Sequence, residues 1–198
     1  MVIEYFYKSK ESLLYWFIFH AKKYNFIPLQ KEKVMEQVKL IYTLSVFSWA
    51  ELPEKAKKAI EAAKDASYRA YSPYSNFLVG AAVFLEDGTI VTGNNQENAA
   101  LPSGLCAERT AIFSANSLYP EQPIDILAIA AQSNGEFLKN PITPCGACRQ
   151  VLLESEKRFG KEIEIYLYGT GKIYYLKGVE ALLPLGFCSD TPSSFNRE

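Results

Sequence analysis

Apolar residues recur along the chain at the three- and four-residue spacing that predicts amphipathic helices. This spacing is clearest over residues 53–70, which begin close to a proline, a residue that suits the first turn of a helix. Two further helices are expected over residues 106–118 and 145–158, and each of these segments begins with a cysteine. The expected buried face of the first helix consists of Ala56, Ala59, Ile60, Ala63 and Ala66.

Apolar runs between these helices predict strands. Residues 124–131 and 163–168 are almost continuously apolar, which is typical of strands buried on both faces. Residues 79–85 and 89–92 flank an Asp-Gly pair, a strong signal for a tight hairpin turn. Because strands and helices alternate, we expect an α/β fold, a three-layer α/β/α sandwich in which helices cover a mixed sheet.

The first fifty residues do not follow this alternation. We assign residues 1–50 to an N-terminal extension of unknown role and residues 51–198 to the main domain. Residues 13–19 are strongly apolar but fall well short of the roughly 20 needed to cross a bilayer, and no Ala-x-Ala site for export follows them. Residues 36–47 alternate as an edge strand would. The extension is either an amphipathic segment that packs on the domain or a stretch upstream of a true start at Met35.

Composition and charge limit the partners of the chain. The 198 residues are 48% hydrophobic with a formal charge of −1, as expected for one soluble globular domain with an appendage. Nucleic-acid-binding domains usually carry an excess of basic residues, which is missing here. We therefore expect no nucleic-acid partner and no membrane partner.

Two short motifs carry the candidate chemistry. Cys106 and Glu108 lie in the motif Cys-Ala-Glu-Arg, and Cys145 and Cys148 lie in Pro-Cys-Gly-Ala-Cys-Arg. A catalytic zinc site has three protein ligands and one open position. Cys145 and Cys148 are three residues apart, so in the first turn of a helix they lie on one face. At a helix start the side chains of Cys106 and Glu108 can also point toward the same site. The two motifs therefore predict a zinc site with an adjacent free carboxylate.

Charge explains why a base is needed at such a site. Three thiolates and one dication leave a net negative charge, so this zinc is expected to be a weaker Lewis acid than one held by neutral histidines. Glu108 would then take up the proton of the reacting water. Arg109 and Arg149 are the last residues of the two motifs, and we expect both to offset the negative charge by donating to thiolate sulfur.

The alternatives to a catalytic site are a structural zinc knuckle and a redox pair. A closed structural site would need a fourth cysteine or histidine. Cys188 is the only spare cysteine and lies in a tail rich in serine and proline, whereas His20, the single histidine, lies in the N-terminal extension. Neither is expected to bind the metal. Three metal-binding thiolates in a chain of four cysteines indicate a reducing, cytoplasmic compartment.

With these motifs the chain resembles the cytidine deaminases. Zinc nucleobase deaminases share a His- or Cys-x-Glu motif and a Pro-Cys-x-x-Cys motif. Besides the two zinc motifs, the resemblance rests on residues 71–82, 93–99 and 182–184, and it extends over roughly residues 52–187.

The resemblance implies a zinc ion in each subunit and a set of substrate contacts. The aromatic ring of Phe77 would stack on the pyrimidine, while Asn95 and Glu97 would hydrogen-bond the sugar hydroxyls. The backbone amide of Ala107 would hold the carbonyl of the base, and the carbonyl of Thr143 would receive the departing ammonia. Judged without the resemblance, Phe77 fits a strand core equally well, and Asn95 fits a simple turn.

The implied activity is the hydrolytic deamination of cytidine and deoxycytidine in pyrimidine salvage. Glu108 would move a proton from water to ring N3 and then to the exocyclic amine. Two alternatives stay open: a zinc deaminase acting on another aminopyrimidine nucleoside or nucleotide, and a zinc scaffold without catalytic activity.

Short-subunit members of the family are homotetramers whose active sites include residues of neighbouring subunits. Phe187 resembles an aromatic residue that crosses such an interface. The family usually has tyrosine before the proline of one interface loop, where this chain has Leu101 before Pro102. That difference leaves the contact at this position open, although the chemistry is unaffected.

Overall fold

The computed structural model describes residues 39–189, and from Leu40 onward these residues belong to one compact unit. The predictions made for residues 13–19, His20 and Met35 lie outside the described residues. Within residues 39–189, no helix is both long and apolar enough to span a membrane.

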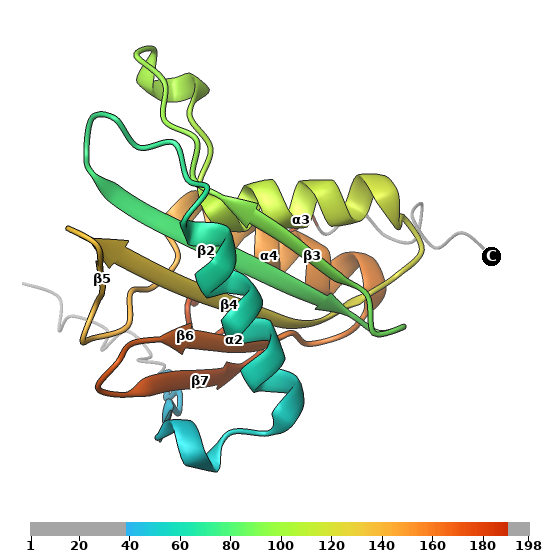
Figure 1. Cartoon of the computed structure of the whole chain (residues 1–198). Helices are drawn as coiled ribbons and strands as arrows, with labels where there is room; N and C mark the ends of the chain where they lie inside the picture. Colours follow the sequence, from blue (N-terminus) through green and yellow to red (C-terminus); the bar gives the residue numbers. More distant parts are fainter. Residues whose placement is uncertain (1–38, 190–198) are drawn as a thin grey trace, which may run out of the picture. The chain divides into compact units, whose positions relative to one another are not determined.

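A mixed sheet of seven strands forms the centre of this unit (Figure 1). Its order is β1-β7-β6-β4-β2-β3, and the short β5 pairs with β4. The β4–β6 pair is parallel, whereas the other pairs are antiparallel. The strands are β1 (Ser45–Phe47), β2 (Phe77–Leu85), β3 (Ile90–Asn94), β4 (Ile124–Ser133), β5 (Glu136–Phe137), β6 (Glu164–Tyr168) and β7 (Ile173–Lys177).

Helix α2 (Glu54–Ser67) covers one face of the sheet, and helices α3 (Ala107–Leu118) and α4 (Gly146–Phe159) cover the other (Figure 1). The predicted three-layer α/β/α sandwich is therefore confirmed. Two short 3-10 helices, η1 (Trp49–Glu51) and η2 (Leu101–Ser103), lie in connecting segments.

One apolar core lies on each face of the sheet, between the sheet and its helices, because successive residues of the central strands point to opposite faces. In β2, Ala81 and Val83 face α3 and α4, whereas Ala82 and Phe84 face α2. Strand β4 divides in the same way and is buried along most of its length. Burial on both faces explains why the sequence of these strands is continuously apolar rather than alternating.

The helix starts agree closely with the prediction. Cys106 and Cys145 are the N-caps of α3 and α4, so each regular helix begins one residue after the cysteine. The first helix ends at Ser67, three residues before the predicted end.

The sheet edges differ more from the prediction. The edge strand expected over residues 36–47 is a strand only over β1, which pairs antiparallel with β7. Strands β5 and β7 were not predicted, since β5 has two residues and β7 is only partly buried. The sheet thus extends into the segment assigned to the N-terminal extension, and the division near residue 50 stays a prediction.

Candidate active site

Three cysteine side chains meet where α3 and α4 begin. The Sγ atoms of Cys106 and Cys145 are 3.7 Å apart, those of Cys145 and Cys148 are 3.4 Å apart, and all three lie within 4.8 Å of one another. Tetrahedral zinc with Zn–S bonds of about 2.3 Å places sulfur atoms about 3.8 Å apart, whereas a disulfide has an S–S bond of about 2.05 Å. The donor set therefore fits zinc.

The thiols differ in burial and in acidity. Cys148 is fully buried, Cys106 is half-buried and Cys145 is exposed. Hydrogen bonding from Cys148, with a further contribution from Arg109, lowers the pKa of Cys106 to about 5. The same interaction between Cys106 and Cys148, together with burial, raises the pKa of Cys148. The cluster thus already favours one thiolate, the form in which cysteine binds a metal.

Glu108 is the second residue of α3 and is buried next to the cysteine cluster. Its side chain is not among the donor atoms that lie within 4.8 Å of one another, so it stands beside the metal site and not in it. It is only 4% exposed, and this burial, with the charge of Cys106, raises the pKa of its carboxyl group. A carboxyl group with a raised pKa in a site of this kind is suited to general acid and base catalysis.

The two arginines act differently, which corrects one expectation. Arg109 donates from Nη2 to the Sγ of Cys106 at 3.8 Å, as predicted. All the hydrogen bonds of Arg149 run instead to oxygen: Nε to Pro144 O at 2.8 Å, Nη1 to Leu182 O at 2.6 Å and Nη2 to Thr143 Oγ1 at 3.1 Å. A planar guanidinium with five N–H donors can serve these three oxygens at once. Arg149 therefore ties the approach to α4 to the segment around Leu182.

The three residues predicted to contact the sugar and the base form one connected group. Asn95 donates from Nδ2 to Phe77 O and accepts from the amide of Val79 at Oδ1, with distances of 2.9 and 2.8 Å. Glu97 accepts hydrogen bonds from the turn that precedes β2. Phe77 begins β2 and is partly buried against the core on the α3 side.

This group is joined to the metal site through the backbone. Gln96 and Leu105 exchange backbone hydrogen bonds of 2.9 and 3.0 Å, which places the residue before Cys106 against the residue before Glu97. Ala107, in the first turn of α3, is fully buried, and amides in a first turn have no partner within the helix. Its N–H is therefore available to an acceptor in this region.

Comparison with known proteins decides the family. Residues 53–160 match the family model described as the cytidine and deoxycytidylate deaminase zinc-binding region. The chain belongs to this family. Together with the three-cysteine group, the match identifies a zinc-binding enzyme of the cytidine deaminase family.

Relatives and solved structures agree with this assignment. A cytidine deaminase from Halalkalibacterium halodurans is 47% identical over 98 residues, which are 50% of this chain and 67% of that protein. A probable cytidine deaminase from Dictyostelium discoideum is 35% identical over 131 residues, 66% of this chain and 82% of that one. The crystal structure of cytidine deaminase from Burkholderia pseudomallei has 40% sequence identity and a TM-score of 0.57, and the match covers 66% of this chain and 98% of that chain.

The remaining residues that the sequence singled out are exposed. Thr143 is exposed just before the cysteines of α4, where its hydroxyl accepts the bond from Arg149. Phe187 is 77% exposed, and its carbonyl oxygen accepts a hydrogen bond of 2.8 Å from Nε2 of Gln150. Leu101, at the position where the family usually has tyrosine, is 80% exposed.

Sequence reasoning assigned no role to Ser75 or Gln150, although both make hydrogen bonds in this region. Ser75 lies within residues 71–82, the motif that carries the resemblance, and precedes Phe77 by two residues. Serine side chains often hydrogen-bond to nearby backbone groups, and this tendency could have identified Ser75 from the sequence.

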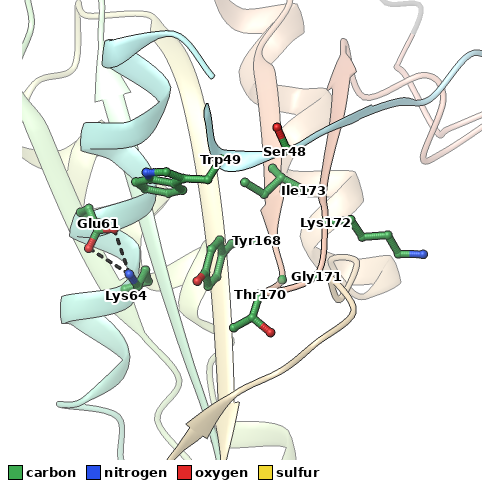
Figure 2. A pocket seen from close by; sticks show the side chains of 10 residues that line it. Ser48, Trp49, Glu61, Lys64, Tyr168, Thr170, Gly171, Lys172 and Ile173 are labelled. Carbon is green, nitrogen blue, oxygen red and sulfur yellow. Dashed lines mark hydrogen bonds and ion pairs between the residues drawn. The ribbon is translucent and has the colours of Figure 1, made fainter. Parts of the chain in front are cut away.

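A hollow of about 390 Å³ lies on the α2 side of the sheet, and none of the predicted site residues lines it (Figure 2). Lys64 of α2 is paired there with Glu61, and its ammonium group lies over the rings of Trp49 and Tyr168 at 5.7 and 5.3 Å. Trp49 also contacts Tyr168 edge to face. These contacts explain how η1 is held against α2 and β6.

Proposed function

We propose that this enzyme hydrolyses cytidine and deoxycytidine to uridine and deoxyuridine with release of ammonia. The observation that carries the proposal is a group of three cysteines that fits zinc, with the buried carboxyl group of Glu108 beside it. Cytidine deaminase is also the name of the relatives and of the solved structure to which the chain is similar.

The chain's own residues divide the reaction among them. Zinc held by Cys106, Cys145 and Cys148 would supply Lewis acidity that lowers the pKa of water. Glu108 takes the proton of the water that attacks C4 and delivers it to ring N3. It then takes the proton of the new C4 hydroxyl and gives it to the amine, so that the C4–N bond breaks, ammonia leaves and the C4 carbonyl forms.

Five further groups bind and orient the substrate. The amide of Ala107 donates to the carbonyl oxygen of the base, and the carbonyl of Thr143 accepts from the departing ammonia. Phe77 stacks on the pyrimidine ring, and Asn95 and Glu97 hold the sugar hydroxyls.

A nucleotide substrate is the strongest alternative, because the matching family model also covers deoxycytidylate deaminases. The charge at the proposed sugar site favours a nucleoside. Hydrogen bonds from Ser75 and from the amide of Tyr74 lower the pKa of Glu97, so this carboxylate is ionised at neutral pH and would repel a phosphate group bound close to it.

We also propose a homotetramer that works in the cytoplasm in pyrimidine salvage. The support for assembly is a set of exposed apolar side chains on α3, η2 and the segment after β7. Exposed apolar side chains that gather in one patch commonly mark an interface with another protein. They are Leu101, Phe113, Leu118, Leu185 and Phe187. Light scattering of the purified chain should give the mass of four subunits, and a monomer would contradict the proposal.

Replacing Glu108 with glutamine tests the assigned chemistry. We expect turnover of cytidine, followed by ultraviolet absorbance, to fall at least about 100-fold, the lower end for loss of a general acid and base. Zinc content should stay near one per chain, because Glu108 is not a ligand. Glu154→Gln, an exposed position on α4, is the matched control and should keep full activity.

A substrate series then separates the alternatives. Cytidine and deoxycytidine should react, while their monophosphates and free cytosine should not. Turnover of the monophosphates alone would identify a nucleotide enzyme. If the zinc-loaded protein reacts with none of these five compounds, the remaining alternatives are a zinc scaffold without catalytic activity and a deaminase for another aminopyrimidine.

A further inference from the structure

One serine hydroxyl connects the proposed base contact with the proposed sugar contact. Ser75 lies in the turn before β2, where its Oγ donates to Oε1 of Glu97. The same Oγ accepts a hydrogen bond of 3.1 Å from the backbone N–H of Phe77. The side chain that would hold the sugar and the residue that would hold the base are therefore linked through a single hydroxyl.

The turn around Ser75 uses most of the acceptor capacity of Glu97. Its Oε2 accepts from the amides of Tyr74 and Ser75 at 2.9 and 3.3 Å, and its Oε1 accepts from the Ser75 hydroxyl. An ionised carboxylate has about four lone-pair positions. Three donors thus fix the orientation of the carboxylate and leave about one position for a ligand.

Asn95 closes the network from the other side. Its Nδ2 donates to Phe77 O, and its Oδ1 accepts from Val79 N, so one N–H of the amide is still available. One free acceptor on Glu97 and one free donor on Asn95 match a hydroxyl group, which both donates and accepts. They do not match a phosphate, which at neutral pH mainly accepts.

We propose that Ser75 is a positioning residue of the sugar site, which orients Glu97 toward the 3′-hydroxyl and so selects nucleosides with that hydroxyl unsubstituted. This inference rests on the proposed function. Ser75 does not touch the substrate; it acts through Glu97 and through the amide of Phe77. The 2′-hydroxyl is missing from deoxycytidine, so a contact shared by both substrates is with the 3′- or the 5′-hydroxyl. We assign the contact to the 3′-hydroxyl, and the substrate pair below tests that assignment.

Ser75→Ala tests the proposal when two substrates are compared. We expect kcat/KM for deoxycytidine to fall about 10-fold, mainly through KM, because a hydrogen bond to a charged group is lost from an exposed position. For 2′,3′-dideoxycytidine, which lacks the 3′-hydroxyl, the same variant should change kcat/KM by less than about 2-fold. A general structural role of Ser75 would lower both values equally.

Two further variants make the comparison specific. Ser75→Thr keeps a hydroxyl and should restore kcat/KM for deoxycytidine to within about 3-fold of the original enzyme. Ser72→Ala removes a hydroxyl from the same turn, three residues earlier, and should leave both substrates unchanged.

Three results would overturn the proposal: equal losses of kcat/KM on the two substrates, no loss on deoxycytidine, or no restoration by threonine. If the original enzyme does not deaminate cytidine or deoxycytidine at all, the proposed function fails first and this inference fails with it. Normal turnover by the original enzyme combined with any of the three results rejects the role of Ser75 alone.

Discussion

Arg109 and Arg149 show how much a side-chain direction matters at the scale of a residue. Each follows a zinc-ligand cysteine closely in sequence, yet only Arg109 donates to sulfur. Arg149 donates to oxygen atoms of Thr143, Pro144 and Leu182. Its contribution is therefore to hold the loop that presents the carbonyl of Thr143, the proposed acceptor for ammonia.

Arg149→Lys should separate this positioning from charge. Lysine keeps the positive charge, but its single ammonium group cannot replace the three guanidinium nitrogens that each donate to a different oxygen. We expect kcat for cytidine to fall about 10-fold while zinc content stays near one per chain, measured by steady-state kinetics and elemental analysis. Arg158→Lys, in the last turn of the same helix, is the control and should keep its kcat. A loss of zinc in Arg149→Lys would show that the arginine supports the metal site and not the loop.

At the scale of an element, the seating of α3 on the sheet depends on Gly93 of β3. A Cβ atom at this position would lie 2.7 Å from Ala107 O and would also clash with the backbone of Ala111. Ala107 is the first residue of α3, between Cys106 and Glu108, so any displacement of the helix moves the site.

Gly93→Ala should therefore impair the site as well as the fold. We expect a lower melting temperature, since overpacking typically costs about 1–3 kcal/mol, and a fall in kcat/KM of about 100-fold, the effect that a displacement of about 1 Å can have on catalysis. Gly80→Ala is the matched control, because its Cβ would clash with the backbone of Ala63 and Ser67 in α2, on the opposite face. It should lower the melting temperature and keep the activity of the protein that remains folded. Equal loss of activity in both variants would refute a specific role for Gly93.

The elements that carry the site could be predicted from sequence better than the rest. The two cysteine motifs begin helices, and a helix start is a local property, so the helix starts predicted at Cys106 and Cys145 lie within one residue of the observed first helical residues. Strand β7 is only partly buried and β5 has two residues, so neither has a clear apolar period. The direction of Arg149 depends on Leu182, 33 residues away, which no local pattern encodes.

At the scale of the whole molecule, the zinc site joins two helices that otherwise belong to separate parts of the sequence. Cys106 is the N-cap of α3, whereas Cys145 and Cys148 lie at the start of α4, and Cys145 follows Cys106 by 39 positions in the sequence. A metal that binds only the folded chain stabilises the fold by mass action. Zinc binding should stabilise the packing of α3 and α4 directly. Helix α2 packs on the opposite face of the sheet, against a core that contains no metal ligand.

Removal of zinc should therefore lower the stability of the chain measurably. At a free zinc concentration of about 100 times Kd, binding contributes about 2.7 kcal/mol, and for a domain of this size each kcal/mol shifts Tm by about 2–4 °C. We expect a chelator to lower Tm by about 5–10 °C in a thermal unfolding experiment, with recovery when zinc is added back. Cys188→Ala should respond in the same way as the original chain, because Cys188 lies outside the cluster. Cys145→Ala should already have the lower Tm and should show no further decrease with chelator, since it lacks a ligand. A chelator response of the same size in Cys145→Ala would mean that the stabilising metal is bound elsewhere.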